Sequence, residues 1–112
     1  MKVCRAGQGT PYEASAHYGN WGAHYFKADE TSRLTVSISH LLPNGGAEMG
    51  AGPERAYYML SGSITVTGSS ETHVLYAGDV LHIAAGEERA ISVNGQEPAS
   101  LLVVIVATDS PS

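Results

Sequence analysis

Glu54-Arg-Ala-Tyr-Tyr-Met-Leu-Ser-Gly62 is followed at once by Ser63-Ile-Thr-Val-Thr67, and these two runs decide the fold. The first run is apolar and aromatic and ends in Ser-Gly, while the second alternates apolar and polar residues. The pair therefore predicts a strand, a tight turn and a second strand. A similar unit, Gly78-Asp-Val-Leu-His-Ile-Ala-Ala-Gly86, leads into a further alternating run, Arg89-Ala-Ile-Ser-Val-Asn94.

In the rest of the chain, short strand-like runs also alternate with turn residues. No segment of ten or more residues has the apolar period of a capped helix, which favours an all-β antiparallel sandwich or barrel. The pattern predicts strands at 33–41, 55–60, 63–68, 72–76, 80–84, 88–94 and 99–108. Pro43-Asn-Gly-Gly46 is expected to end the first of them, and the Gly-rich stretch 47–53 to form a loop.

A length of 112 residues allows one domain. We divide it into an amino-terminal arm at 1–32, a barrel at 33–108 and a frayed tail at 109–112. Six large aromatic and imidazole side chains crowd the arm between His17 and Phe26. So many rings are unusual in a solvated tail, so the arm is expected to pack on the barrel or on a partner subunit.

Alternation along 33–41 places Leu34, Val36 and Ile38 on one face, which we expect to be the inner one. His40 falls in register with this apolar set and is expected to point inward as well. The last strand, from Ala99 to Ala107, is apolar on both faces, so both sides need cover. A second subunit could supply the outer cover, and a homodimer is therefore expected.

Charge and cysteine content exclude several classes of function. With a formal net charge of −5, the chain is not expected to have a basic surface patch that could bind nucleic acid or an anionic membrane. The single cysteine, Cys4, cannot form an intrachain disulfide, which suits a reducing compartment. No signal peptide or membrane-spanning run is recognisable, so a cytoplasmic protein is expected.

The two turn-punctuated units resemble the two motifs of the cupin family, whose fold is a jelly-roll or double-stranded β-helix barrel. Pro43-Asn-Gly-Gly46 looks like the turn of the first motif, and Tyr57-Tyr-Met-Leu-Ser-Gly62 looks like its closing strand. The second motif is matched by Gly78, Ala84, Gly86, Arg89 and Asn94, with alanine in place of proline. The resemblance covers residues 33 to 107.

The metal-ligand positions of the family do not carry ligands here. The resemblance sets its three histidines and one glutamate on Glu48, Gly50, Arg89 and Arg55. Arginine remains protonated and has no lone pair to donate, so the usual metal is expected to be absent and no cofactor is implied. Three alternatives remain open: a one-residue slip that brings in Glu54, a relocated metal on His40, His82 and Glu48, and surface ion pairs of both arginines with Glu54, Glu87 or Glu88.

The altered pocket predicts a ligand of the opposite charge. If the alignment holds, one cavity contains Arg55, Tyr57, Met59, Arg89 and Ile91, with Glu48 at its mouth. A guanidinium binds a carboxylate through two parallel hydrogen bonds, so a small organic acid is the expected ligand, with its body against Tyr57, Met59 and Trp21. The alternative is a small enzyme, an isomerase, cyclase or lyase, that uses His82, His40 or Glu48 as a base.

Overall fold

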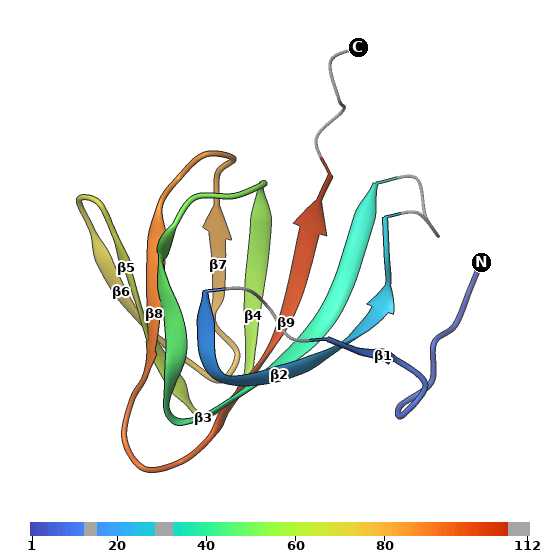
Figure 1. Ribbon diagram of the computed structural model, residues 1–112, viewed down its shortest axis with the longest axis horizontal. Helices are drawn as coiled ribbons and strands as arrows, with labels where there is room; N and C mark the ends of the chain where they lie inside the picture. The colour runs from blue at the N-terminus through green and yellow to red at the C-terminus, as the bar shows by residue number, and fades with distance from the viewer. Residues whose placement is uncertain (13–15, 29–32, 108–112) are drawn as a thin grey trace.

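The computed structural model describes residues 1–12, 16–28 and 33–107, and within them it contains strands and turns but no helix (Figure 1). The strands form one antiparallel sheet that curls into a nearly closed barrel, which confirms the expected all-β barrel. They are β1 (Thr10–Tyr12), β2 (His17–Phe26), β3 (Leu34–Gly50), β4 (Arg55–Ser61), β5 (Ser63–Gly68), β6 (Thr72–Tyr76), β7 (Val80–Ile83), β8 (Arg89–Val93) and β9 (Ala99–Val106).

Strand order in the sheet is β6-β5-β8-β3-β9-β4-β7, and β2 also pairs with β3. The two edge strands of this path, β6 and β7, face each other across the seam of the barrel (Figure 1). The turn between β4 and β5 contains Gly62 at a φ of 74°, a backbone conformation that favours glycine. The strand–turn–strand reading of residues 54–67 is therefore confirmed.

β3 is much longer than the sequence predicted. The strand does not end at Pro43 but continues to Gly50, so the expected loop at 47–53 begins only after residue 50. Its first half pairs with β9 and its second half with β8, so the strand turns a corner of the barrel. Gly46 permits this close crossing, because a Cβ there would lie 2.1 Å from the carbonyl oxygen of Ile91.

The inner and outer faces of β3 are the reverse of the expectation. Ser37 and Ser39 point into the barrel and are only 1% and 7% exposed, whereas Leu34 is largely exposed on the outer face. Val36, Ile38 and His40 share that outer face with Leu34, because side chains alternate along a strand. The prediction failed because the apolar face was assumed to be the inner one, while the barrel interior here is partly polar.

The amino-terminal segment contributes two strands of the sheet. β2 pairs with β3 from Phe26 to His17, and β1 pairs with β2 from Thr10 to Tyr12. The predicted tail at 109–112 lies outside the described residues. In the described part of the chain no helix is long and apolar enough to cross a membrane.

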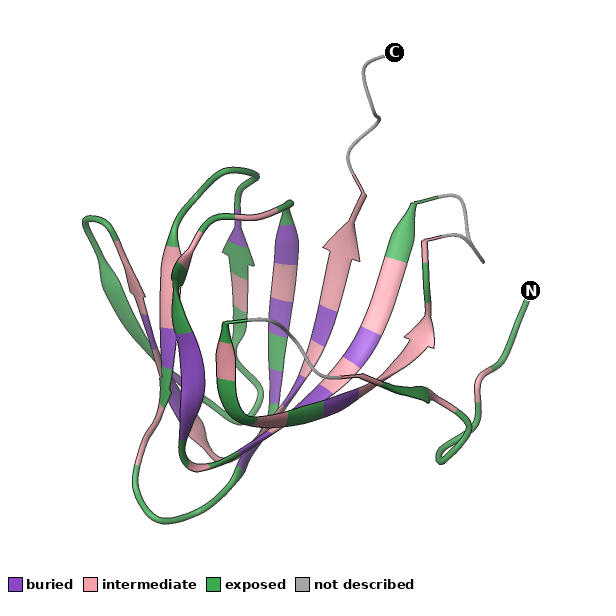
Figure 2. Ribbon diagram, viewed as in Figure 1, coloured by how far each residue is buried: buried purple, intermediate pink, exposed green. Residues whose placement is uncertain are grey.

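The core lies between the curled walls of the sheet, where buried bands recur along β3, β4 and β9 (Figure 2). Its members are the following buried side chains: Leu41, Ala47, Tyr57, Met59, Ile64, Val66, Leu75, Ile83, Ile91, Ala99, Leu101 and Val103. Arg55 is the one charged side chain among the buried residues of the described chain. It marks the polar end of the barrel interior.

Candidate functional site

A cavity of about 140 Å³ opens within the barrel, between the β2–β3–β9 wall and the inner faces of β4 and β8. Most of its volume is bounded by hydrocarbon, and the polar groups converge from β1, β2, β3, β4 and β8. The lining residues are Tyr12, His17, Asn20, His24, Ser37, Ser39, Leu41, Arg55, Tyr57, Arg89, Ile91, Leu101, Val103 and Ile105.

Arg55 is the most unusual of these residues. It begins β4 and is 6% exposed, and its direct cross-strand neighbours are Ile83 and Ile105, which cannot accept a hydrogen bond. Nη1 donates to the carbonyl oxygen of Pro53 at 3.1 Å, while Nε and Nη2 are buried and have no partner. Burying a permanently charged group with two unsatisfied donors destabilises the folded state by roughly several kcal/mol, the usual penalty for one unpaired buried ion.

Arg89 is the second cation of the cavity and is better satisfied. Its Nε donates to the hydroxyl of Tyr57 at 3.0 Å, and its Nη1 donates to the backbone oxygen of Glu48 at 3.3 Å. Both arginines therefore bond to neutral oxygens. The alternative in which Arg55 is a solvated surface residue is wrong, because its guanidinium is buried inside the barrel.

The opposite wall of the cavity is built from paired polar side chains. His24 Nδ1 lies 2.6 Å from Ser37 Oγ, and the hydroxyl of Tyr12 lies 2.6 Å from Ser39 Oγ. The rings of Tyr12 and His24 are stacked with centroids 4.0 Å apart. Gly22 makes room for Tyr12, because a Cβ at residue 22 would lie 2.6 Å from the tyrosine ring.

Four of the side chains expected in one cavity do meet there: Arg55, Tyr57, Arg89 and Ile91. They do so because residues 55 and 57 share one face of β4 and residues 89 and 91 share one face of β8. Met59 continues the β4 series but is completely buried in the core and does not line the cavity. Glu48 is exposed and reaches the site only through its backbone oxygen.

Three other candidates lie elsewhere. Trp21 and His40 stack on the outer face at a centroid distance of 5.1 Å, and His40 Nδ1 lies 2.8 Å from Ser100 Oγ. His82 is also outside the cavity, where its Nε2 lies 2.7 Å from Glu54 Oε2. The structure therefore does not bring His40, His82 and Glu48 together as a relocated metal site.

A divalent cation does not fit the groups that line the cavity. In the described ranges no three His, Cys, Asp or Glu side chains are grouped as metal ligands. The cavity offers two imidazoles but no carboxylate or thiolate among its lining residues. Two guanidiniums beside them would repel a cation. The donor set matches an anion better than a metal ion.

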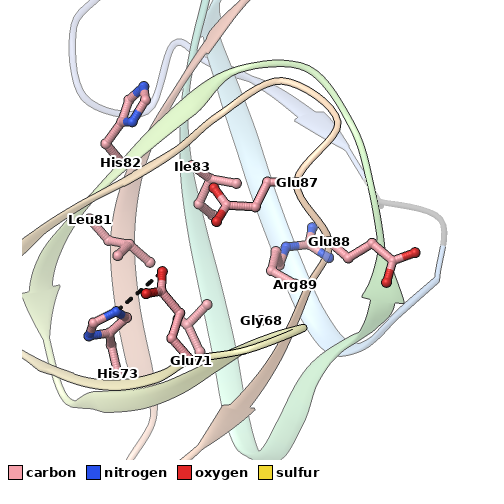
Figure 3. A pocket seen from close by; sticks show the side chains of 10 residues that line it. Gly68, Glu71, His73, Leu81, His82, Ile83, Glu87, Glu88 and Arg89 are labelled. Atoms are coloured by element: carbon pink, nitrogen blue, oxygen red, sulfur yellow. Dashed lines mark ion pairs between the residues drawn. The ribbon is translucent and has the colours of Figure 1, made fainter.

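Acidic side chains gather instead at the β6–β7 seam, around a hollow of about 20 Å³ (Figure 3). Glu71, Glu87 and Glu88 line it, and Glu71 is 3.6 Å from His73 Nε2 in the contact drawn there. Because a single water needs about 10–15 Å³, this hollow has no room for an organic ligand. Within the described residues the larger cavity is the better candidate site.

Sequence reasoning missed the contribution of the amino-terminal strands. Tyr12, Asn20 and His24 line the cavity although all three lie before the region of family resemblance. A usable signal was present, since Asn20, Gly22 and His24 alternate with Trp21 and Ala23 and so share a face of one strand. The Gly-rich, irregular appearance of residues 1–20 concealed that strand.

The chain is similar to one protein family and to several known proteins. A family model described as a cupin domain matches residues 40–105. A protein of Mycobacterium tuberculosis named Beta-D-galactosidase Rv1717 is 34% identical over 108 residues, which cover 94% of this chain and 93% of that protein. A crystal structure described as a predicted oxalate decarboxylase from Thermotoga maritima has a TM-score of 0.82 at 22% identity, covering 96% and 100% of the two chains. The polyketide cyclase RemF from Streptomyces resistomycificus has a TM-score of 0.83 at 17% identity, covering 99% and 82%.

The environment of His24 makes the stability of the fold depend on pH. Burial, and then the positive charge of Lys27, lower the pKa of this imidazole below 6.5. The folded chain thus favours neutral His24, and this preference adds to the free energy of unfolding. The added stability is fully present above pH 6.5, falls as the pH drops through 6.5, and reaches its lowest level below the lowered pKa of His24. We expect denaturant unfolding at a series of pH values to show this decline.

The variant His24→Gln should flatten the pH profile between pH 7 and 5, because glutamine does not titrate. His73→Gln is the matched control, since His73 is a surface residue of β6 with a half-exposed side chain. A His24→Gln profile as steep as that of the unmodified protein would contradict the assignment.

Proposed function

Since the chain belongs to the cupin family, with its cavity at the polar end of the barrel, we propose that this cavity binds a small organic acid through Arg55. The observation that carries the proposal is the buried guanidinium with two unpaired N–H groups. Nε and Nη2 lie on the same edge of the planar group and project in parallel. That edge matches the two oxygens of a carboxylate.

The other lining residues support the same kind of ligand. Arg89 is held by Tyr57 and adds a second positive charge to the cavity. Leu101, Val103 and Ile105 form an apolar wall from β9 that suits a short hydrocarbon body. The cavity volume of about 140 Å³ limits the guest to roughly the size of benzene, which a cavity of about 150 Å³ accepts in another protein.

The proposal includes a change in the charge of the preferred ligand, from a cation to an anion. The resemblance to the family sets metal-ligand positions on Arg55 and Arg89, and a guanidinium in a ligand position replaces attraction for a cation with attraction for an anion. We propose that this exchange adapted the barrel to acids. It also accounts for an otherwise costly burial of charge, because a bound carboxylate would neutralise it.

We expect the variant Arg55→Gln to lose about 10- to 100-fold in affinity for short carboxylates such as propanoate, because a hydrogen bond to a charged group contributes about 1.5–3 kcal/mol. Isothermal titration calorimetry measures the affinity directly. Arg5→Gln is the matched control, since Arg5 is exposed and is not among the residues that line the cavity. Equal affinities of Arg55→Gln and the unmodified protein would rule out this role.

Catalysis on such an acid is a second possibility that one observation favours. An isomerase, cyclase or lyase needs a base next to the bound substrate. His24 lines the cavity, and its lowered pKa keeps it neutral near pH 7, so it can accept a proton. We propose His24 in this role in place of His40, His82 or Glu48, which lie outside the cavity.

Hydrolysis of a β-galactoside is a third candidate, favoured by the name of the relative that is 34% identical. Such hydrolysis usually needs two carboxyl groups about 5–9.5 Å apart that flank the scissile bond. Among the described residues none lines the cavity, and the acidic groups lie at the seam. We therefore expect no release of nitrophenol from nitrophenyl β-galactoside. Release that is lost in Glu87→Gln or Glu88→Gln would instead favour the glycosidase.

We also propose that the chain is a homodimer through the outer face of the β2–β3–β9–β4–β7 sheet. One row across this face consists of Ala23, Ile38, Leu102, Tyr58 and Val80, paired strand to strand. The chain is acidic overall, but this row carries no charge, so two copies can approach there without like-charge repulsion. Tyr58 and Val80 are exposed and the other three are half-buried, and an apolar row that reaches the surface in this way is typical of an interface.

Light scattering after size exclusion should give twice the mass of the chain, and Val80→Glu should reduce it to the mass of a monomer. Two charges placed at a symmetric interface would be desolvated and would repel each other. Val74→Glu is the matched control on β6, since Val74 is 47% exposed and Val80 is 65% exposed. A monomer in the unmodified protein, or equal effects of both variants, would contradict this interface.

A further inference from the structure

We infer that the acid in the cavity carries a carbonyl group one carbon beyond its carboxylate, and that the hydroxyl of Tyr57, oriented by Arg89, donates a hydrogen bond to this carbonyl oxygen. The inference rests on the proposed function, because it takes Arg55 as the site of the carboxylate. It adds the chemical class of the ligand, a short 3-oxo acid, and the residue that selects it.

The direction of the Tyr57 hydroxyl is imposed by its partner. Tyr57 is 3% exposed, and its oxygen lies 3.0 Å from Arg89 Nε. A guanidinium only donates, so the tyrosine oxygen must be the acceptor in this contact. Its own proton therefore points away from Arg89, and it has no acceptor among the described residues. Since native proteins leave few buried polar groups unpaired, a ligand that accepts this proton is the expected explanation.

Arg89 is thereby a positioning residue for Tyr57. Its Nη1 also donates to the backbone oxygen of Glu48 at 3.3 Å, so the guanidinium is held at two points. The hydrogen bond that Nε donates to the tyrosine oxygen polarises the O–H bond and strengthens the next hydrogen bond in the chain. Arg89 therefore fixes the direction of the hydroxyl and improves it as a donor.

Arg55 and Tyr57 offer their free donors to the same ligand. They are two residues apart on one face of β4, and both line the cavity. Nη1 of Arg55 donates to Pro53, which precedes the strand. In a planar guanidinium the edge of Nε and Nη2 lies opposite Nη1, so this edge is turned away from Pro53. One short ligand can therefore meet this edge and the hydroxyl of Tyr57.

The strand register places Tyr57 one inward-facing row deeper than Arg55. Arg55 is level with Ile105, whereas Tyr57 is level with Val103. The row of Tyr57 continues through Ser37 to His24, the residue proposed above as a base. A ligand whose carboxylate is bound by Arg55 thus extends its body to the level at which Tyr57 and His24 lie.

This spacing favours a second acceptor that is separated from the carboxylate. Residues two apart in a strand leave it about 6.6 Å from each other. The carbonyl of a 2-oxo acid is bonded directly to the carboxylate, whereas in a 3-oxo acid a methylene group separates them. A carbonyl oxygen only accepts, so it matches a donor without a proton of its own to place. 3-Oxobutanoate has about seven non-hydrogen atoms, close to the size of benzene that the cavity volume allows.

Calorimetric titration of the unmodified protein with four acids tests the inference. Butanoate, 2-oxobutanoate, 3-hydroxybutanoate and freshly prepared 3-oxobutanoate share a carboxylate and a four-carbon chain. We expect 3-oxobutanoate to bind about tenfold tighter than butanoate, the effect of one hydrogen bond of about 1.4 kcal/mol, and tighter than the other two. Binding of 2-oxobutanoate or 3-hydroxybutanoate as tight as that of 3-oxobutanoate would overturn the assignment to a 3-oxo acid.

The variant Tyr57→Phe assigns the preference to the hydroxyl, because phenylalanine keeps the ring and removes the donor. Its ratio of affinities for 3-oxobutanoate and butanoate should fall to about one, with the affinity for butanoate unchanged. Tyr76→Phe is the matched control, since Tyr76 is 62% exposed and does not line the cavity. A ratio that remains near ten in Tyr57→Phe would overturn its role. An equal loss for both acids would also do so, because the hydroxyl would then serve the carboxylate.

The variant Arg89→Met tests the positioning role. Loss of the positive charge weakens both acids alike and cancels in the ratio of affinities, so a change in the ratio reports the orientation of Tyr57. We expect the ratio to fall at least about twofold, because residues in one hydrogen-bond network are coupled, and to stay near one when Tyr57→Phe is also present. An unchanged ratio in Arg89→Met would overturn this role.

Failure of this inference can be told apart from failure of the proposed function. If none of the four acids binds the unmodified protein, the role proposed for Arg55 fails, and the inference fails with it. If the acids bind with equal affinities, only the carbonyl group and its recognition by Tyr57 are overturned.

Discussion

The burial of one guanidinium, that of Arg55, is the constraint on which the rest of this structure depends. A charge that cannot be lost lies between two isoleucines at the start of β4, and only one of its nitrogens has a partner. In a closed hydrocarbon core this arrangement would be strongly destabilising. A cavity adjoins the charge, and we propose that an acceptor enters this cavity from outside.

The surrounding sheet is adapted to that cavity. Between Leu34 and Ser39, β3 turns its serines inward and its aliphatic residues outward, and the inward serines lie within hydrogen-bonding distance of His24 and Tyr12. The amino-terminal strands thereby become a wall of the site. A partly polar interior combined with an apolar patch on the exterior is costly for a monomer, and both features are explained together if the interior binds a polar ligand and the exterior binds a second copy, as we propose.

Membership of the cupin family determines the barrel but leaves its chemistry open, because function depends on the side chains that line the cavity. The relative that is 34% identical is named a galactosidase, yet the cavity described here is small and is lined by cations and amide, imidazole and hydroxyl groups. In the function that we propose, a ligand of the size of a short acid would pair with these groups. We propose that the positions that the resemblance associates with a metal serve here to bind an anion.

The sequence by itself determined the all-β architecture, most strand positions and the convergence of Arg55, Tyr57, Arg89 and Ile91. These features depend on local rules, namely turn residues and the alternation of side chains along short strands, which neighbouring residues are sufficient to reveal.

Only the tertiary structure decided which face of β3 is inside, that β3 continues through Gly46 to Gly50, and that Asn20 and His24 reach the cavity. Alternation identifies two faces but cannot say which one a distant strand will cover. The pairing of β2 with β3 and the close approach of residue 46 to Ile91 depend on contacts between residues far apart in the chain, and those contacts exist only once the barrel has closed.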